Sequence, residues 1–492
     1  MSARQATHSS HAMSFNTPSL NDQRRYPPEW VFEAGLRHHH LANTAYPIRH
    51  QTTMRPYRVP QDEMERTATA AWQETATLGL YVHVPFCAAR CRYCEYTVVD
   101  RSEHEAEDRY FDALLQEVSL WQERLSTMGS ADRTLIGFDI GGDTPAFARA
   151  DNIRRVVEAV RSTFRFRPGM AISIETTPVI AAAPAGAGAA AGAGREPDKI
   201  RALREMGIER ISMGVQTTHL TLAHSLGREY EGLSMLERAV RHIREAGFSR
   251  LNIDLMYGFA QQSAEAWRSS VEQTIALGPE YITLYQMRYK GTSIEEQAAA
   301  VSRDQVNRLR ELAHELLLGA GYAGAPGKNT YSRVPDDVGT SDYLTERVVK
   351  GTPYLGLGLG AQSMSPYTLS YNLGAATKSL APYLRAIEAG RLPIQDLYHL
   401  PLEVAMAKII AVSFYFGQIH LGSFQQKFGV SLEKHFAREV AFVLREGLME
   451  YAGPCLRLTH AGARTWNGVV ALFYAGAVQE YLIHLESGLR AA

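Results

Sequence analysis

Residues 81–94 are YVHVPFCAARCRYC, and three of the four cysteines of the chain fall in this stretch. Cys87, Cys91 and Cys94 have the spacing CxxxCxxC and follow an apolar run that predicts a β-strand. Thiolates are soft ligands that suit zinc or iron–sulfur clusters. Three thiolates can hold three irons of a 4Fe-4S cluster and leave the fourth iron open to a small molecule. The stretch therefore predicts a reactive metal centre just after a strand.

Zinc is the alternative occupant of this group, with His83 completing a Cys3His site. Structural zinc usually takes two short pairs of ligands from separate loops, and the sequence has no second pair. The fourth cysteine, Cys455, lies far along the chain in GPCLRL, which predicts a buried strand thiol. A chain of 492 residues with four cysteines also has no need of a disulfide framework. These points favour the iron–sulfur cluster.

Length and charge set broad limits on the function. The 492 residues predict two to three domains. The net charge of −1 gives no reason to expect nucleic acid or an anionic membrane as a partner. No apolar run has the length of a membrane helix, and the polar N-terminus lacks a signal-peptide core. Clustered free cysteines without an export signal predict a reducing, cytoplasmic location.

Apolar strand-like runs alternate with helical patterns from residue 79 onward, which predicts an α/β fold. The runs are residues 79–84, 134–140, 170–175, 209–215, 250–257 and 280–287. Such β/α units in series imply a parallel sheet with helices outside. In parallel α/β folds, functional groups gather at the carboxyl ends of the strands.

The pattern divides the chain into three predicted parts. Residues 1–77 form an N-terminal extension, residues 78–375 form the core, and residues 376–492 form a mainly helical, winged-helix-like domain. The balanced charge predicts that this last domain packs or acts as a lid instead of binding DNA. Within the core, the Ala/Gly-rich residues 181–194 predict a flexible surface insertion.

The N-terminal extension carries two further expectations. Its polar residues 1–25 are expected to be disordered. Residues 30–72 contain aromatics and prolines without clear periodicity, and we expect an arm that packs on the following domain or closes over it. The run from His38 to His40 is expected to form an exposed polar turn and not a metal site.

The cysteine spacing after YVHVPF resembles that of the radical S-adenosylmethionine (SAM) superfamily, and more narrowly its oxygen-independent coproporphyrinogen III oxidase-like (HemN-like) branch. The resemblance covers roughly residues 78–475. It implies a partial (β/α)6 radical SAM barrel followed by a HemN-like C-terminal domain. It also implies that Cys87, Cys91 and Cys94 hold a 4Fe-4S cluster whose open iron chelates SAM. An electron donor such as flavodoxin or ferredoxin would then drive cleavage of SAM to a 5′-deoxyadenosyl radical.

The resemblance assigns SAM contacts to the ends of the predicted strands. GGDTP at 141–145 resembles the family motif GGGTP, with Asp143 in place of the third glycine. The positions implied for a first SAM are Tyr81, Gly142, Glu175 and, in the later segment YLGLGLGAQS, Gln362. Those implied for a second SAM are Tyr93, Asp143, Thr144, Gln216, Arg228 and Asp254. Arg288 stands at a further SAM-contact position but is not the family residue. Arginine suits a carboxylate, and aspartate suits ribose hydroxyls or an ammonium group.

Two departures bear on the choice of function within the branch. Coproporphyrinogen oxidases have a further cysteine two residues after the third ligand, where this chain has Tyr96. Heme-chaperone members have a HNxxYW motif, where residues 340–344 are TSDYL and lack the histidine. The sequence therefore favours a transferase resembling class C radical SAM methyltransferases and cyclopropanases. In these a radical formed from the first SAM takes a hydrogen from the methyl group of the second, and that carbon is added to an sp2 carbon of a small molecule. The alternatives are an oxidative decarboxylase of the coproporphyrinogen oxidase type and a heme-binding chaperone without turnover.

Overall fold

The structure is a computed structural model that describes residues 24–99, 106–126, 133–183, 198–228 and 230–485. Most of the predicted disordered N-terminus and most of the predicted Ala/Gly-rich insertion lie outside these residues. No helix in the described part of the chain is long and apolar enough to cross a membrane.

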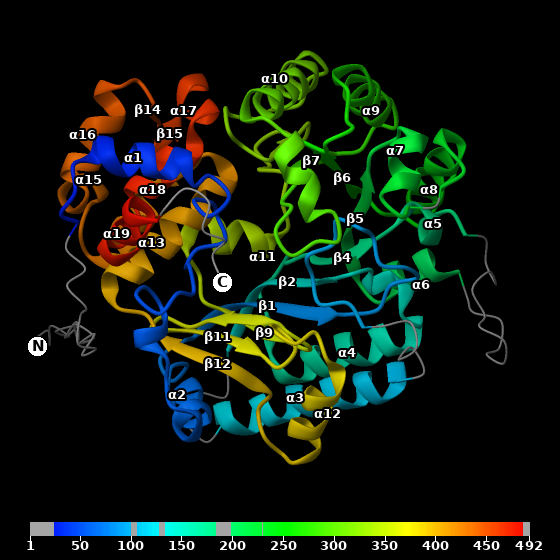
Figure 1. The fold of residues 1–492 in the computed structure, drawn as a ribbon. Coiled ribbons are helices and arrows are strands. Elements are labelled where there is room, and N and C mark those ends of the chain that lie inside the picture. The colour runs from blue at the N-terminus through cyan, green and yellow to red at the C-terminus, as the bar shows by residue number, and fades with distance from the viewer. Residues whose placement is uncertain (1–23, 100–105, 127–132, 184–197, 229, 486–492) are drawn as a thin grey trace, which may run out of the picture.

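Six neighbouring parallel strands form the centre of the main sheet, in the order β1-β2-β4-β5-β6-β7 (Figure 1). Their bounds are β1 Thr77–Val84, β2 Thr134–Gly142, β4 Ile172–Thr176, β5 Ile208–Gln216, β6 Arg250–Tyr257 and β7 Tyr281–Gln286. These are the strands that the sequence predicts, and the α/β fold class is confirmed. Because neighbours in the sheet run parallel, their carboxyl ends share one edge.

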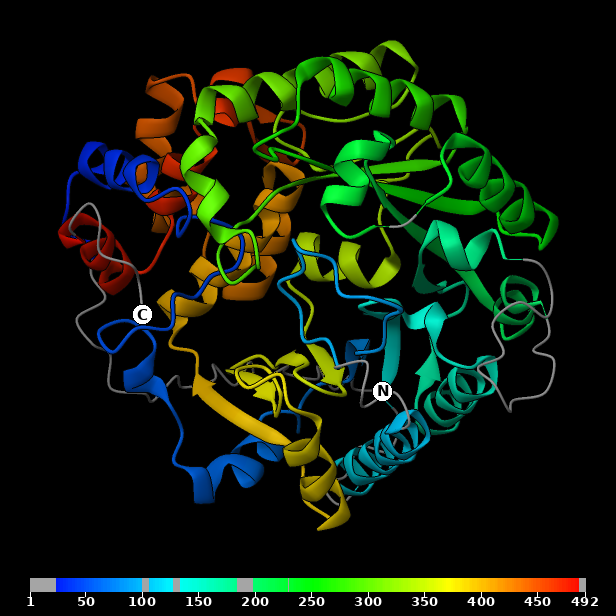
Figure 2. The same cartoon turned by 45° about the vertical axis from the view of Figure 1, so that its right-hand side comes forward.

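Helices cover the outer side of this curved sheet (Figure 2). They are α3 Glu107–Ser126, α4 Ala150–Thr163, α5 Pro178–Ala181, α6 Lys199–Glu205, α8 Leu233–Glu245, α9 Ala264–Ala276 and α10 Arg303–Gly319. The short helix α7 Leu220–Ser225 lies instead beside the cysteine loop, where Arg92 N donates to Leu226 O. In α4, the apolar residues Ile153, Val156, Val157 and Val160 are buried, as their spacing predicts.

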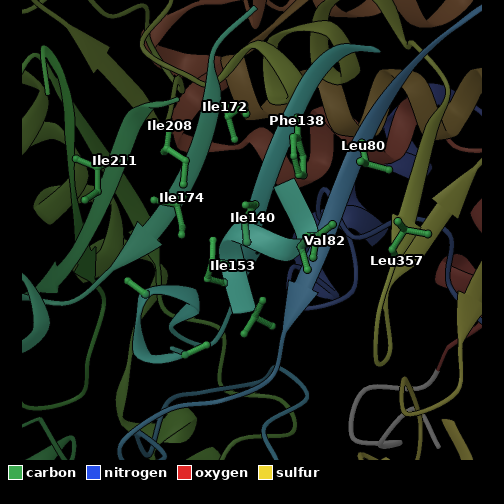
Figure 3. Packing of buried hydrophobic residues seen from close by; sticks show 14 of the residues in the cluster. Leu80, Val82, Phe138, Ile140, Ile153, Ile172, Ile174, Ile208, Ile211 and Leu357 are labelled. Carbon is green, nitrogen blue, oxygen red and sulfur yellow. The ribbon is translucent and has the colours of Figure 1, made fainter. Parts of the chain in front are cut away.

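The alternation of side chains along each strand separates a core face from a site face. Val82, Ile140, Ile174 and Ile211 are at most 1% exposed and belong to one cluster with Ile153 of α4 (Figure 3). The residues next to them in the strands therefore point to the opposite, inner face. Because the inner residues are largely polar, the sheet encloses a functional interior.

The sheet extends beyond these six strands on both sides. β9 (Tyr354–Leu357) pairs parallel with β1, and β8 (Thr330–Ser332) pairs antiparallel with β7. Beyond β9 the pairing is antiparallel, through β10 Gln362–Met364, β11 Thr368–Asn372 and β12 Ile394–His399. β3 (Arg165–Phe166) pairs with β2. Since β12 lies after residue 375, the domain boundary at that residue stays a proposal.

A short helix crosses the inner face of the sheet. α11 (Asp342–Thr345) contacts β2 and continues into the π-helix η6 (Glu346–Lys350). A side chain at Gly137 of β2 would collide with the backbone of Tyr343, so glycine gives α11 room to approach. This contact brings residues after α11 into the interior.

The C-terminal region is mainly helical and contains a separate three-stranded sheet in the order β13-β15-β14. Its strands are β13 Gln418–His420, β14 Met449–Ala452 and β15 Cys455–Leu458. The helices from α12 onward are α12 Leu380–Glu388, α13 Leu402–Ser413, α14 Leu421–Phe428, α15 Leu432–His435, α16 Ala437–Arg445, α17 His460–Arg464, α18 Trp466–Leu472 and α19 Gly476–His484. Cys455 is 5% exposed in β15, which confirms the prediction of a buried strand thiol.

The N-terminal arm packs on two regions: Met64, Ala68 and Trp72 join the hydrophobic core of the main sheet, as predicted, whereas the first helix of the arm packs elsewhere. α1 (Pro28–Arg37) lies against α18 and α19 of the C-terminal region, and a Cβ on Gly35 would be 2.6 Å from that of Ala471. α2 (Met64–Ala70) contacts β12. The arm therefore contacts both the main sheet and the C-terminal region. In the turn at residues 38–40, His39 and His40 are exposed, but His38 is 4% exposed, so the prediction of an exposed turn was wrong for His38.

Candidate functional site

Every site residue that the sequence predicts lines one cavity of about 2300 Å³. The cavity lies at the carboxyl ends of β1, β2, β4, β5 and β6, where a parallel sheet is expected to carry its site. This volume exceeds the roughly 300–1,000 Å³ of a typical small-molecule pocket. The cavity has room for more than one ligand.

The loop after β1 presents the three cysteines to this cavity as free thiols. Its ends are fixed by backbone hydrogen bonds, since Val99 N donates to Pro85 O (2.9 Å) and Arg92 N donates to Leu226 O (3.0 Å). Each cysteine sulfur has a different neighbour. Cys87 Sγ lies 3.2 Å from Thr144 Oγ1, Cys91 Sγ 3.6 Å from Arg228 Nη1 and Cys94 Sγ 3.7 Å from Asp143 Oδ1.

This donor set fits a 4Fe-4S cluster better than a single ion. In the described part of the chain, no three His, Cys, Asp or Glu side chains come close enough to hold one metal ion. A cluster spreads its thiolates farther apart, because each binds a different iron. Burial raises the pKa of Cys87, and burial with Asp143 nearby raises that of Cys94 to about 12, so metal binding must drive deprotonation of these thiols.

His83 does not complete a zinc site in this arrangement. Its Nε2 is 3.2 Å from the carbonyl oxygen of Thr97, and its Nδ1 is 3.3 Å from the hydroxyl of Tyr81. Burial lowers the pKa of His83 to about 4, so the ring is neutral near pH 7. We infer a structural role for His83, fixing the end of β1 beside Tyr81.

The loop after β2 requires glycine at one position. Gly142 has φ +131°, and a Cβ there would be 2.5 Å from Val84 O. Its N–H donates to Glu175 Oε2 at 3.2 Å. Next to it, Asp143 Oδ2 is buried without a partner in the described structure, and burial raises the pKa of Asp143 to about 8. The loop therefore presents a backbone amide and an acid beside the cysteines.

Glu175 at the end of β4 lies beside Tyr81 of β1. A Cβ on Gly141 would be 2.8 Å from the Tyr81 ring and 3.0 Å from Glu175 Oε1. Glu175 opens to the cavity but is enclosed by protein, and this desolvation, together with Asp254 and Asp139 nearby, raises its pKa to about 8. A cation that entered the cavity would favour its charged form.

Three of the six residues predicted for a second SAM lie in or beside β5 and β6, namely Gln216, Arg228 and Asp254. Gln216 has φ +70°, a strained conformation for a side chain of this type, and its Oε1 is buried without a partner in the described structure. Arg228 donates to the Tyr93 hydroxyl (2.6 Å) and to the carbonyl of Gly214. Asp254 accepts hydrogen bonds from Ser212 (2.8 Å) and Asn252 (2.7 Å).

The two remaining predicted residues already have protein partners. Arg288 forms an ion pair with Glu95, on the cysteine loop. Gln362 Oε1 accepts a hydrogen bond from the Tyr354 hydroxyl. If Arg288 contacts SAM, it must share its ion pair with Glu95. If Gln362 contacts SAM, it must share its hydrogen bond with Tyr354.

Sequence reasoning missed a buried carboxylate, Glu117, that holds a backbone turn in place. Glu117 of α3 is fully buried and accepts hydrogen bonds from Gly358 N (2.8 Å), Asn372 Nδ2 (2.8 Å) and the Tyr383 hydroxyl (2.7 Å). It thereby fixes the glycine-rich turn between β9 and β10. The sequence signal is an acid on the otherwise apolar face of α3.

SAM affinity should depend on pH through Glu175. Because its raised pKa of about 8 keeps the acid largely protonated at pH 7, binding a sulfonium cation should require loss of that proton. We expect affinity to fall by up to about tenfold per pH unit below pH 8. Calorimetric titrations of reconstituted enzyme with SAM at pH 6.5 and 8.5 would measure this. The ammonium of SAM titrates equally in a Glu175→Gln control, so an equal pH dependence there would contradict the assignment.

Comparisons with known proteins agree with this site. Residues 81–273 match the radical SAM superfamily. An oxygen-independent coproporphyrinogen III oxidase of Paracoccus denitrificans is 30% identical over 335 residues, covering 65% of this chain and 69% of that protein. The protein of the same name from Salmonella typhimurium is 25% identical over 416 residues, 81% of this chain and 85% of that one. The solved structure of coproporphyrinogen III oxidase (HemN) from Escherichia coli matches with a TM-score of 0.67 at 23% identity, covering 84% of this chain and 93% of that one.

The fold and the three-cysteine site define a radical SAM enzyme. The chain belongs to the radical SAM superfamily, in its HemN-like branch of oxygen-independent coproporphyrinogen III oxidase-like proteins. Its cofactors are a 4Fe-4S cluster and SAM, which together supply a 5′-deoxyadenosyl radical when bound. Such an enzyme needs a small-molecule substrate and a reductant.

Proposed function

We propose that this enzyme is an oxidative decarboxylase of the coproporphyrinogen III oxidase type. The observation that carries the proposal is the similarity to oxygen-independent coproporphyrinogen III oxidases, which extends over 81% of the chain and so includes much more than the cysteine loop. The size of the cavity, about 2300 Å³, supports it, because a tetrapyrrole precursor and SAM need more space than one small ligand. This reverses the preference of the sequence analysis, where decarboxylation is the alternative.

In this proposal the substrate loses a hydrogen atom from a propionate side chain. The side chain then loses carbon dioxide and one electron, which a one-electron acceptor must take, and a vinyl group remains. The contribution of the protein is to hold and orient the reactants and to exclude water. Cys87, Cys91 and Cys94 would hold the cluster.

Glu175, Tyr81 and the N–H-bearing turn at Gly142 would orient SAM beside the cysteines. The supporting contacts are the hydrogen bond from Gly142 to Glu175 and the packing of Glu175 and Tyr81 on either side of Gly141. A carboxylate at this point suits the ammonium of SAM. Gln362, which accepts a hydrogen bond from Tyr354, remains a proposed contact.

A second candidate is transfer of a carbon from a second SAM to the substrate. Tyr96 favours it, because this residue replaces the further cysteine of coproporphyrinogen oxidases and is 55% exposed in the cavity wall. The unpartnered Gln216 Oε1 and the fixed Arg228 and Asp254 would hold the second SAM, with Tyr93, Asp143, Thr144 and Arg288 nearby.

One experiment separates the candidates. Reconstituted enzyme, a strong reductant and SAM with a deuterated S-methyl group are incubated with and without coproporphyrinogen III, and the products are analysed by mass spectrometry. Decarboxylation predicts unlabelled 5′-deoxyadenosine that depends on the porphyrinogen, together with a product that is lighter by carbon dioxide and two hydrogens for each propionate converted to a vinyl group. Deuterated 5′-deoxyadenosine with S-adenosylhomocysteine would instead support carbon transfer. In a parallel titration with heme, tight binding without formation of either nucleoside would favour a chaperone.

We place the enzyme in the cytoplasm, with flavodoxin or ferredoxin as electron donor. The support is chemical: the three clustered cysteines must stay reduced to bind iron, and an oxidising compartment favours disulfides.

A further inference from the structure

Several cationic side chains line the same cavity as the cysteines without belonging to either predicted SAM group, and two of them lie close together on neighbouring helices. These two are Arg347 in the π-helix η6 and Lys408 in α13. η6 contacts α13, where the main sheet meets the C-terminal region (Figure 1). π-Helical turns inside α-helices are rare and occur frequently at functional sites.

Lys408 is a buried ammonium without a counter-ion. Its side chain is 3% exposed, and Nζ donates to the carbonyl of Tyr46 at 2.5 Å. Among the described residues it forms no ion pair, although buried charges are normally paired. Burial and the nearby Arg347 lower its pKa to about 7. An anion in the cavity would restore the full charge.

Arg347 is fixed by aromatic rings instead of an acid. Its guanidinium lies 4.4 Å from the centroid of the Tyr354 ring, and Nη1 is 3.5 Å from the Tyr343 hydroxyl. Nε is buried and has no partner in the described structure. The adjacent Glu346 does not neutralise it, since that carboxylate pairs with Arg167 (2.9 Å) and Lys350 (2.8 Å).

An acid near Arg347 is Asp139 on β2. The two interact electrostatically but form no ion pair; Asp139 Oδ2 accepts a hydrogen bond from Ser341 at 2.6 Å, and Asp139 Oδ1 is buried without a partner in the described structure. Arg347 and Lys408 therefore share a low-dielectric wall of the cavity, and neither has an ion-pair partner among the described residues. Such a wall attracts a carboxylate strongly, because little water competes with it.

We propose that Arg347 and Lys408 form a subsite for a carboxylate of the substrate. The guanidinium offers a planar fork for two oxygens, and the ammonium adds a point charge. The assignment of that carboxylate to a tetrapyrrole rests on the proposed function, whereas the subsite itself would serve any carboxylate substrate of fitting size. SAM also has a carboxylate, so the test must separate the two sources.

The test uses full-length reconstituted enzyme and three variants. Arg347→Gln and Lys408→Met remove the two charges, and Lys290→Met is the matched control, since Lys290 is an exposed lysine on the same cavity. Coproporphyrin III, the stable oxidised tetracarboxylate, is titrated by fluorescence, and SAM is titrated by equilibrium dialysis. We expect coproporphyrin affinity to fall at least about tenfold in both variants and by no more than about twofold in the control. SAM affinity should stay within about twofold throughout.

If wild type binds coproporphyrin and both variants bind it equally well, the proposal is overturned; a loss confined to SAM binding would assign the subsite to SAM. Melting temperatures distinguish a binding role of Lys408 from a purely structural role. Lys408→Met should melt no lower than wild type, because it removes an uncompensated buried charge, whereas a lysine needed to anchor Tyr46 would lower it.

Glutarate, a plain dicarboxylate, separates failure of the subsite from failure of the proposed function. It should raise the melting temperature of wild type but not of Lys408→Met. If wild type does not bind coproporphyrin yet glutarate stabilises it through Lys408, the tetrapyrrole is wrong and the subsite stands. If neither ligand acts through Lys408, the subsite is wrong.

Discussion

Replacing Cys87, Cys91 or Cys94 by alanine should abolish both the brown colour of the anaerobically purified protein and its formation of 5′-deoxyadenosine. The three sulfurs meet three different neighbours around the cavity, so none can replace another. We expect nucleoside formation to fall at least about a thousandfold, or about 4 kcal/mol in barrier height. Iron and sulfide analysis together with liquid chromatography of the nucleosides would measure the two losses.

Cys455→Ala provides the matched control for these variants. Its thiol is buried in β15, outside the cavity. The variant should keep its iron, its sulfide and its nucleoside formation, with only a modest loss of stability. Full iron content and undiminished 5′-deoxyadenosine in any of the other three alanine variants would refute the assignment of the cluster to the loop after β1.

Glu175→Gln should weaken SAM binding without unfolding the protein. The amide has almost the same shape as the acid and can still accept the hydrogen bond from Gly142. It lacks the charge that an ammonium or sulfonium requires, and hydrogen bonds to charged groups contribute about 1.5–3 kcal/mol. We therefore expect the dissociation constant for SAM to rise roughly tenfold to 150-fold, as measured by equilibrium dialysis.

Glu231→Gln controls for the loss of one negative charge from the cavity wall. Glu231 also lines the cavity, but its side chain is 71% exposed and pairs with Arg238. This variant should bind SAM as wild type does. Equal binding in both variants would mean that Glu175 does not contact SAM.

The central architecture could be predicted from sequence because its signals are local. Each of the six parallel strands is a short apolar run bounded by polar segments, and each helix repeats its apolar residues every three to four positions. Parallel pairing then places every strand end at one edge. For this reason residues as distant in sequence as Tyr81, Glu175 and Asp254 could be expected around one cavity, and the structure places them there.

Features that depend on distant contacts escaped prediction. The arm at α1 packs on helices more than 400 residues away, and this partner leaves no trace in the local pattern of residues 30–72. Glu117 meets Asn372 through the same kind of long-range contact. Lys408 offered a weak signal, since it is a lone charge in the apolar run VAMAKIIAV, but a single charge does not reveal which cavity it faces.

The function was harder to predict than the fold. The sequence preference for carbon transfer rests on single positions, of which Tyr96 is the clearest. Similarity over most of the chain points toward the coproporphyrinogen oxidases instead. A cavity wall can change by one residue while the sheet and the cysteine loop remain the same, so function varies faster than fold.

The most direct test of the account is electron paramagnetic resonance of the reduced, reconstituted protein with and without SAM. Three protein ligands leave one iron to bind SAM directly, so adding SAM should change the signal of the cluster. The Glu175→Gln variant should need more SAM for the same change. A protein without iron, or a cluster signal identical with and without saturating SAM, would contradict the three-cysteine site with an open iron.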